Sequence, residues 1–109
     1  CNGSVALHLA LHCVDVGPGD EVIVPTFTYI ASVNAIALAG AKPVFVDVRA
    51  EDWLIDPASV EAAVTPKTKA IMPVDLYSAV SDPAIVEMAR ERGLAVVEDC
   101  AEGFGTTRD

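Results

Sequence analysis

The sequence predicts an α/β protein whose sheet is mostly parallel and carries helices on both faces. Four short apolar runs are separated by stretches with helical signals, and these runs lie at 21–24, 43–47, 69–74 and 95–98. The runs lack the alternation of a strand that faces water on one side, which indicates strands buried on both faces. The connections are long enough for helical crossovers, and parallel neighbours require crossovers of that length.

The first helix is expected over residues 4–16. Ser4 can cap it, and apolar residues follow on almost every side, a pattern typical of a buried helix. Residues 17–20, with two glycines, a proline and an aspartate, form a strong turn signal. A short strand is then expected at 21–24, stopped by Pro25.

Two helices are expected in the middle of the chain. One covers 28–38 and is closed by Gly40 in a C-cap position. After the strand at 43–47, Asp56 caps a short helix that runs through 57–64 and begins with proline, which suits a first helical turn. Both helices fit the crossovers that a parallel sheet needs.

The last helix and strand have the clearest boundaries. The strand at 69–74 is followed by Asp82, which can cap a helix that ends at Arg92. Gly93 closes this helix, because glycine readily takes the left-handed conformation found at helix ends. The final strand is expected at 95–98.

Composition limits the function classes. At 109 residues the chain is one domain at most. Its content of hydrophobic residues, 52%, is high for a free-standing small domain, and its content of charged residues, 21%, is low. We therefore expect a piece of a larger core, truncated at both ends. The net charge of −9 argues against nucleic-acid binding, which needs positive charge. No apolar run approaches the roughly 20 residues of a membrane-spanning helix, so no membrane partner is expected.

Cysteines and histidines carry no metal or disulfide signature. Cys1, Cys13 and Cys100 are odd in number and irregular in spacing, which favours a reducing, cytoplasmic setting. His8 and His12 lie one helical turn apart, a spacing that suits a metal, but no third ligand accompanies them. No metal is expected.

The strongest chemical candidate is Asp99, directly after the last strand. Ligands of parallel α/β sheets gather beyond the carboxyl ends of the strands. A buried carboxylate there needs a partner, and a protonated ring nitrogen of pyridoxal phosphate would serve. The alternatives are that Asp99 caps the following turn or pairs with an arginine.

Four further residues favour the same kind of site, and each has an alternative explanation. Gly3 and Ser4 precede a helix, whose amino end attracts phosphate, although a plain helix cap explains them too. Tyr29, at a strand-to-helix junction, can stack on a flat ring or pack on the sheet edge. Glu102 can reach the pocket of Asp99 or be a solvated loop charge.

Six stretches in order complete the pattern: 2–11, 17–25, 28–35, 40–47, 65–71, and 98–102 with Gly105. Together they resemble the DegT/DnrJ/EryC1/StrS family of pyridoxal-phosphate-dependent nucleotide-sugar aminotransferases. The resemblance implies an aspartate-aminotransferase-like fold, with residues 1–109 forming part of its large cofactor-binding domain and the small C-terminal domain absent. Residues 25–32 and 98–102 look most like members that make GDP-perosamine.

The resemblance implies a role for each candidate residue. Gly3-Ser4-Val5 matches the turn that holds the cofactor phosphate, with the Val5 amide contributing. Tyr29 matches the aromatic residue that stacks on the pyridine ring, and Asp99 matches the carboxylate paired with the pyridine nitrogen. Glu102 occupies the position of a polar side chain near the ring hydroxyl or the substrate.

The chain departs from the family pattern in two places. Asp75 and Ser78 stand where the family usually has His and Gly. The family's Schiff-base lysine lies well beyond residue 109, and Lys42, Lys67 and Lys69 lie within matched motifs and cannot replace it. The 109-residue chain alone is therefore expected to be inactive.

The resemblance implies a whole protein that moves an amino group, with glutamate as the expected donor, to a nucleotide-linked keto sugar. The conversion of GDP-4-keto-6-deoxymannose to GDP-perosamine is one such reaction, and the family implies a homodimer. Two alternatives stay open. One is a pyridoxamine-phosphate-dependent sugar 3-dehydratase of the same fold, with His in place of the lysine. The other is a non-catalytic homologue that senses a ligand.

Overall fold

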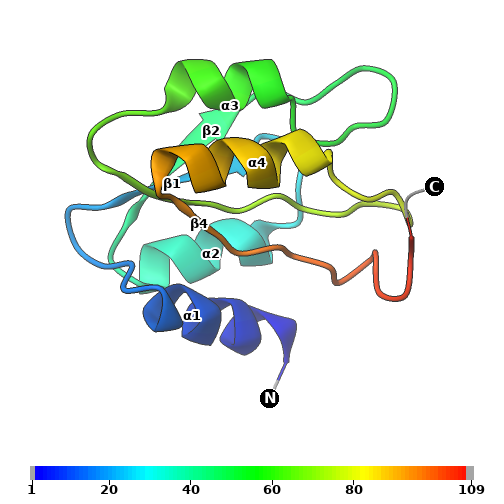
Figure 1. Cartoon of the computed structure of the whole chain (residues 1–109). Helices are drawn as coiled ribbons and strands as arrows, with labels where there is room; N and C mark the ends of the chain where they lie inside the picture. The colour runs from blue at the N-terminus through cyan, green and yellow to red at the C-terminus, as the bar shows by residue number, and fades with distance from the viewer. Residues whose placement is uncertain (1, 108–109) are drawn as a thin grey trace.

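Helices and strands alternate along the chain in the order that the sequence predicts. The computed structural model describes residues 2–107 (Figure 1). The elements are α1 (Gly3–Cys13), β1 (Glu21–Pro25), α2 (Ile30–Leu38), β2 (Lys42–Val46), α3 (Pro57–Ala63), β3 (Thr68–Ile71), α4 (Pro83–Arg92) and β4 (Ala95–Val96). None of these described helices has the length and apolar character that crossing a membrane requires.

The four strands form one parallel sheet in the order β2-β1-β3-β4. The chain therefore leaves β1 toward one side of the sheet, to β2, and later fills the other side with β3 and β4. The point where the order reverses lies between the carboxyl ends of β1 and β3. In α/β sheets this switch point is where ligands bind.

Two helices cover each face of the sheet. Figure 1 shows α1 and α2 on one face and α3 and α4 on the other. The central strand β1 serves both layers: Val22 and Val24 belong to the core beside α1 and α2, and Ile23 belongs to the core beside α3 and α4. Because both faces are buried, β1 lacks the alternating pattern of a half-exposed strand, as the sequence predicts.

The predicted ends of the later helices are confirmed. The Asp56 carboxylate accepts hydrogen bonds from the amides of Ala58 and Ser59 at the start of α3. The Asp82 carboxylate accepts from the Ala84 amide at the start of α4, and Gly93 ends α4 with φ of 68°. Local capping chemistry therefore fixes these two helices.

The start of α1 differs from the prediction. Asn2, not Ser4, is the N-cap: its backbone is extended and its side-chain oxygen accepts the Val5 amide at 3.1 Å. Ser4 already lies within the helix. The helix ends at Cys13 rather than residue 16, and of its side chains only those of Leu7 and Leu11 are buried among the described residues. The expectation of a helix buried on most faces is wrong for this structure.

The other boundaries shift by a few residues. The helix α2 begins at Ile30 instead of residue 28, with Tyr29 as its cap, and β1 includes Pro25. The strand β4 is shorter than predicted, but the chain rejoins the sheet further on through a single parallel bridge between Val74 and Asp99. This bridge brings Asp99 to the sheet edge that the sequence predicts.

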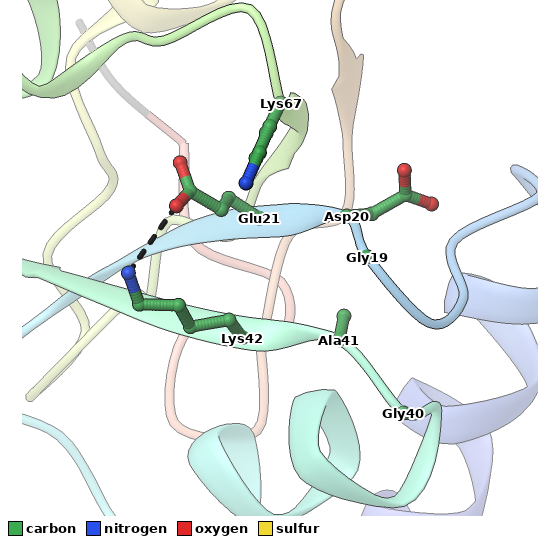
Figure 2. A pocket seen from close by; sticks show the side chains of 7 residues that line it. All are labelled: Gly19, Asp20, Glu21, Gly40, Ala41, Lys42 and Lys67. Atoms are coloured by element: carbon green, nitrogen blue, oxygen red, sulfur yellow. Dashed lines mark hydrogen bonds and ion pairs between the residues drawn. The ribbon is translucent and has the colours of Figure 1, made fainter.

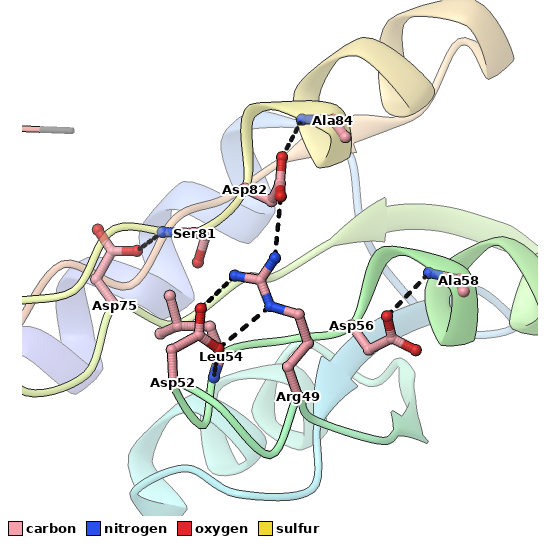
Figure 3. A network of polar contacts seen from close by, with 9 residues as sticks. All are labelled: Arg49, Asp52, Leu54, Asp56, Ala58, Asp75, Ser81, Asp82 and Ala84. Carbon is pink, nitrogen blue, oxygen red and sulfur yellow. Dashed lines mark hydrogen bonds and ion pairs between the residues drawn. The ribbon is translucent and has the colours of Figure 1, made fainter. Parts of the chain in front are cut away.

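A polar network fastens the loop between β2 and α3 to the start of α4 (Figure 3). The Arg49 guanidinium contacts the carboxylate of Asp52 in its own loop and that of Asp82, the latter at 3.0 Å. Asp82 also caps α4, so one carboxylate serves both contacts. These ion pairs are only partly exposed, and they tie the loop before α3 to the start of α4.

Candidate functional site

A pocket of about 210 Å³ opens at the carboxyl edge of the sheet. It is lined by Gly3, Ser4, Leu7, Tyr29, Ala31, Asp99 and Ala101. These residues come from the start of α1, the start of α2 and the loop after β4. The N-terminal end of α1 and the loop after β4 lie at the same end of the molecule in Figure 1. The fold therefore brings four of the sequence-predicted site residues, Gly3, Ser4, Tyr29 and Asp99, into one pocket.

Asp99 is fixed in the pocket wall by its backbone and its side chain. Its amide donates to the Pro73 carbonyl, and its carbonyl accepts from the Asp75 amide, so the backbone is strand-like. The residue is 7% exposed. Its Oδ2 accepts the Ser32 hydroxyl at 2.8 Å, and its Oδ1 accepts the Ala101 amide at 3.2 Å. A carboxylate has about four acceptor positions, so room remains for a further donor.

The bond from Ala101 shows that one sequence-based alternative holds in part. Asp99 does cap the turn that follows it, because its side chain accepts the amide two residues on. The residue nevertheless lines the pocket as well. Capping and a ligand contact are compatible, since the two bonds use separate acceptor positions.

Ser32 is the residue that the sequence analysis missed. It is 0% exposed on α2, and its hydroxyl lies 3.0 Å from that of Thr28. The available signal was weak: two hydroxyl residues four apart, on one side of an otherwise apolar stretch. Its partner Asp99 is 67 residues away, so only the folded chain reveals the contact.

The start of α1 leaves room beside its backbone. A Cβ built on Gly3 would meet no other described atom within 4 Å, so packing does not explain the glycine. The first amides of a helix lack intrahelical partners. The Val5 amide donates to Asn2, and Val5 does not line this pocket. The structure thus assigns the Val5 amide a protein partner and leaves Gly3 and Ser4 facing the pocket.

Tyr29 also lines a second pocket of about 210 Å³. The second pocket is lined by Phe27, Thr28, Tyr29, Leu76, Tyr77 and Glu102. Tyr29 is 75% exposed, so its side chain is largely open to solvent rather than packed on the sheet edge. Glu102 lies in the second pocket, where its carboxylate accepts the Tyr77 amide at 3.1 Å. It is an exposed residue with a defined partner.

Two groups of potential metal ligands occur in the described part of the chain. The ligand atoms of Asp75, Glu98 and Cys100 lie within 4.8 Å of one another. Burial, and next the Glu98 carboxylate, raise the pKa of the Cys100 thiol to about 11, and the neutral thiol is a poor ligand. His8 and His12 are exposed and contact each other, with 3.1 Å between their Nε2 atoms. We assign no metal to either group.

A further pocket, of about 270 Å³, lies at the opposite edge of the sheet (Figure 2). It is lined by Gly19, Asp20, Glu21, Gly40, Ala41, Lys42 and Lys67. Glu21 accepts the Lys42 ammonium at 3.3 Å and the Thr65 hydroxyl at 2.6 Å. This pocket lies at the amino ends of β1 and β2, away from the edge where ligands of such sheets bind.

Comparison with known proteins agrees with this geometry. The family model described as "DegT/DnrJ/EryC1/StrS aminotransferase family" matches residues 1–109. The chain belongs to this family. The resemblance stated from the sequence motifs is thereby confirmed.

Two curated relatives and one solved structure illustrate the match. The GDP-perosamine synthase of Escherichia coli O157:H7 is 57% identical over 106 residues, covering 96% of this chain and 29% of that protein. A protein of Geobacillus stearothermophilus named pleiotropic regulatory protein is 56% identical over 105 residues, covering 95% and 28%. NtdA from Bacillus subtilis, solved with bound cofactor PMP, superposes with a TM-score of 0.93 at 40% identity, covering 96% and 24%. The chain spans less than a third of the length of the curated relatives it matches.

Proposed function

We propose that the whole protein is a pyridoxal-phosphate-dependent aminotransferase that acts on a nucleotide-linked keto sugar. One observation carries the proposal: a buried carboxylate, an exposed aromatic ring and an open helix start share one pocket at the switch point of a parallel sheet. Family membership supports it, since the family is named for aminotransferases.

The donor and acceptor groups of the pocket fit this cofactor. Asp99 would accept a hydrogen bond from the protonated ring nitrogen, because its carboxylate has an unused acceptor position. Tyr29 would lie against the ring face. Gly3 and Ser4 would hold the phosphate at the positive end of α1, with the Ser4 hydroxyl as an additional donor. The open space beside Gly3 favours close approach of an anion to the backbone.

The residues of this chain would act on the reaction by binding and by holding charge. When bound, the cofactor supplies an electron sink for the carbon that loses its proton, and it carries nitrogen between substrates. Asp99 would keep the ring nitrogen protonated and so maintain that sink. Tyr29 would fix the ring plane, and the start of α1 would fix the phosphate. The lysine that moves protons is expected beyond residue 109.

The substrate class is proposed from the relatives. One curated relative of 57% identity is named GDP-perosamine synthase, and others are named for aminotransferases of nucleotide sugars. We propose glutamate as donor and GDP-4-keto-6-deoxymannose as acceptor. We further propose a cytoplasmic homodimer, for which the exposed apolar side chains of Val5, Leu9 and Leu38 on α1 and α2 offer contact surface.

A second candidate function has one observation in its favour. The Geobacillus relative, 56% identical, is named a regulatory protein. We propose as the alternative that the whole protein binds the cofactor or a nucleotide sugar and signals its presence without turning it over. This alternative uses the same pocket, so binding alone does not separate the two functions.

Turnover separates them. The whole protein, loaded with pyridoxal phosphate, is mixed with glutamate and the keto sugar, and the amino sugar is measured by mass spectrometry alongside the cofactor absorbance. The aminotransferase proposal expects product and a spectral change with glutamate alone. In Asp99→Ala most activity should be lost while circular dichroism shows the fold retained. Binding without product would favour the regulator, and a full rate in Asp99→Ala would remove Asp99 from the mechanism.

A further inference from the structure

The hydroxyl of Ser32 is a buried donor aimed at the candidate cofactor partner. Ser32 is 0% exposed on α2, and its Oγ donates to Asp99 Oδ2 at 2.8 Å. A hydrogen bond to an ionised acceptor is among the stronger ones, and burial removes competing water. Ser32 is therefore placed to restrict the orientation of the Asp99 carboxylate.

The hydroxyl of Thr28 contacts the hydroxyl of Ser32. Thr28 Oγ1 lies 3.0 Å from Ser32 Oγ. An ionised carboxylate only accepts, so the single proton of Ser32 points at Asp99, and the remaining capacity of Ser32 is as an acceptor. Thr28 has one hydroxyl proton and two acceptors within reach, Ser32 Oγ at 3.0 Å and the Tyr29 carbonyl at 3.3 Å. When the Thr28 proton is directed at the nearer Ser32, the two hydroxyls form a chain of donors toward Asp99, in which each bond strengthens the next.

The same helix carries the aromatic residue of the pocket. Tyr29 caps α2 and lines the pocket, and Ser32 lies one turn further into that helix. The Asp99 carboxylate is thus tied to the element that presents the aromatic ring. The other carboxylate oxygen, Oδ1, is held by the Ala101 amide. With one protein donor on each oxygen, the carboxylate has a fixed plane.

We propose that Ser32, supported by Thr28, is a positioning residue for Asp99. It holds the carboxylate in the orientation in which a free acceptor position faces the ring nitrogen of the cofactor, and so it raises the affinity of the ring nitrogen for its proton. This inference rests on the proposed function, because it concerns the same pocket and the same cofactor.

The test uses the whole protein loaded with pyridoxal phosphate that carries ¹⁵N in its ring. Ser32→Ala removes the donor, and Ser32→Thr keeps a hydroxyl at the same place. Ser59→Ala is the matched control, since it also removes a serine-to-aspartate bond, that of Ser59 Oγ to Asp56 Oδ2 at 2.7 Å, on α3. The ring-nitrogen chemical shift is followed against pH, the cofactor Kd is measured by fluorescence, and thermal unfolding is recorded.

The expected result is specific to the cofactor. In Ser32→Ala the ring nitrogen should lose its proton about one pH unit lower, and the Kd should rise about tenfold, as expected for a lost charge-assisted bond. Ser32→Thr should restore both values toward wild type. Ser59→Ala should lower the unfolding temperature and leave the nitrogen signal and the Kd unchanged.

Several outcomes would overturn the inference. A wild-type nitrogen titration and Kd in folded Ser32→Ala would make Ser32 a structural residue only, with the proposed function intact. If Ser32→Ala does not fold, Thr28→Val carries the test: a smaller shift in the same direction supports the chain of hydroxyls, and no shift contradicts it. A wild-type protein that binds no pyridoxal phosphate would overturn the proposed function and this inference with it.

Discussion

The Glu102 carboxylate accepts the backbone N–H of Tyr77 at 3.1 Å, across 25 residues of sequence. Tyr77 and the next residue, Ser78, both have left-handed backbones, with φ of 51° and 64°. Such conformations are unfavourable for residues other than glycine unless surrounding contacts maintain them. The Glu102 side chain therefore connects the loop after β4 to the strained loop after β3, next to the candidate cofactor pocket.

Removing this acceptor should loosen the strained loop. We expect Glu102→Ala to lower the free energy of unfolding by about 1 kcal/mol, the usual contribution of one such hydrogen bond. Glu102→Gln keeps an oxygen that can accept the Tyr77 amide and should unfold like wild type. Urea unfolding of the whole protein measures both. Unchanged stability in Glu102→Ala would contradict a stabilising contact between the two loops. Lost turnover in a stable Glu102→Gln would instead indicate that the charge of the Glu102 carboxylate is needed for substrate binding.

The strain itself can be relieved at Ser78. Glycine takes positive φ without steric conflict, and the DegT/DnrJ/EryC1/StrS family usually has glycine at the position of Ser78. Ser78→Gly should raise the free energy of unfolding by about 0.5–1 kcal/mol, after the entropy that glycine loses on folding. Ser59→Gly, within the helix α3, should have the opposite sign because it also breaks the bond to Asp56. A lower free energy of unfolding in Ser78→Gly would show that the Ser78 side chain makes a contact whose stabilisation exceeds the backbone strain.

Gly103 is required by the close approach of Asp75. A Cβ on Gly103 would lie 2.6 Å from the Asp75 Cβ, well inside contact distance. Gly103→Ala should therefore destabilise the protein by about 1–3 kcal/mol through overpacking. Gly17→Ala is the control, because a Cβ there meets no described atom within 4 Å and φ is not positive. Equal melting temperatures for the two variants would contradict the steric argument.

Helix boundaries were predictable where the signal is local. Asp56, Asp82 and Gly93 each act within three residues of the helix end they define, so the sequence contains the whole interaction. The first helix was harder, because Asn2 and Ser4 are both able to cap. The choice depends on where the chain turns from extended to helical, and Asn2, with φ of −147°, makes that turn.

The candidate site was predictable in outline and not in its supporting contacts. Asp99 and Tyr29 follow buried strands, and parallel strands place their carboxyl ends together, so residues far apart in sequence could be expected to meet. Ser32 could not be found in this way. Its contact depends on how α2 rotates against the sheet, which is decided by packing of the whole layer and not by local pattern.

Glu21, at the opposite edge, makes stability depend on pH. The Thr65 hydroxyl, and then Lys42, hold the pKa of the Glu21 carboxyl below its ordinary 4.5. A lowered pKa in the folded state means stabilisation that is complete above the unfolded pKa and is lost as pH falls through the folded value. The stability difference between wild type and Glu21→Gln should thus be constant above pH 5 and shrink below about pH 4.5. Urea unfolding across pH 3–7 measures it, and Thr65→Val should remove much of the pH dependence.

The last prediction concerns thiol reactivity, because Cys13 and Cys100 differ in exposure to solvent. Cys13 is exposed, whereas burial and the Glu98 carboxylate raise the pKa of Cys100 to about 11. The thiolate is the reactive form, so at pH 8 only about one in a thousand Cys100 thiols is reactive. Timed alkylation with iodoacetamide and peptide mapping should show Cys13 modified at least tenfold faster. Glu98→Gln should increase the alkylation rate of Cys100 only in part, since burial is the larger cause of its raised pKa. Equal rates for both cysteines in wild type would mean that the loop after β4 opens in solution.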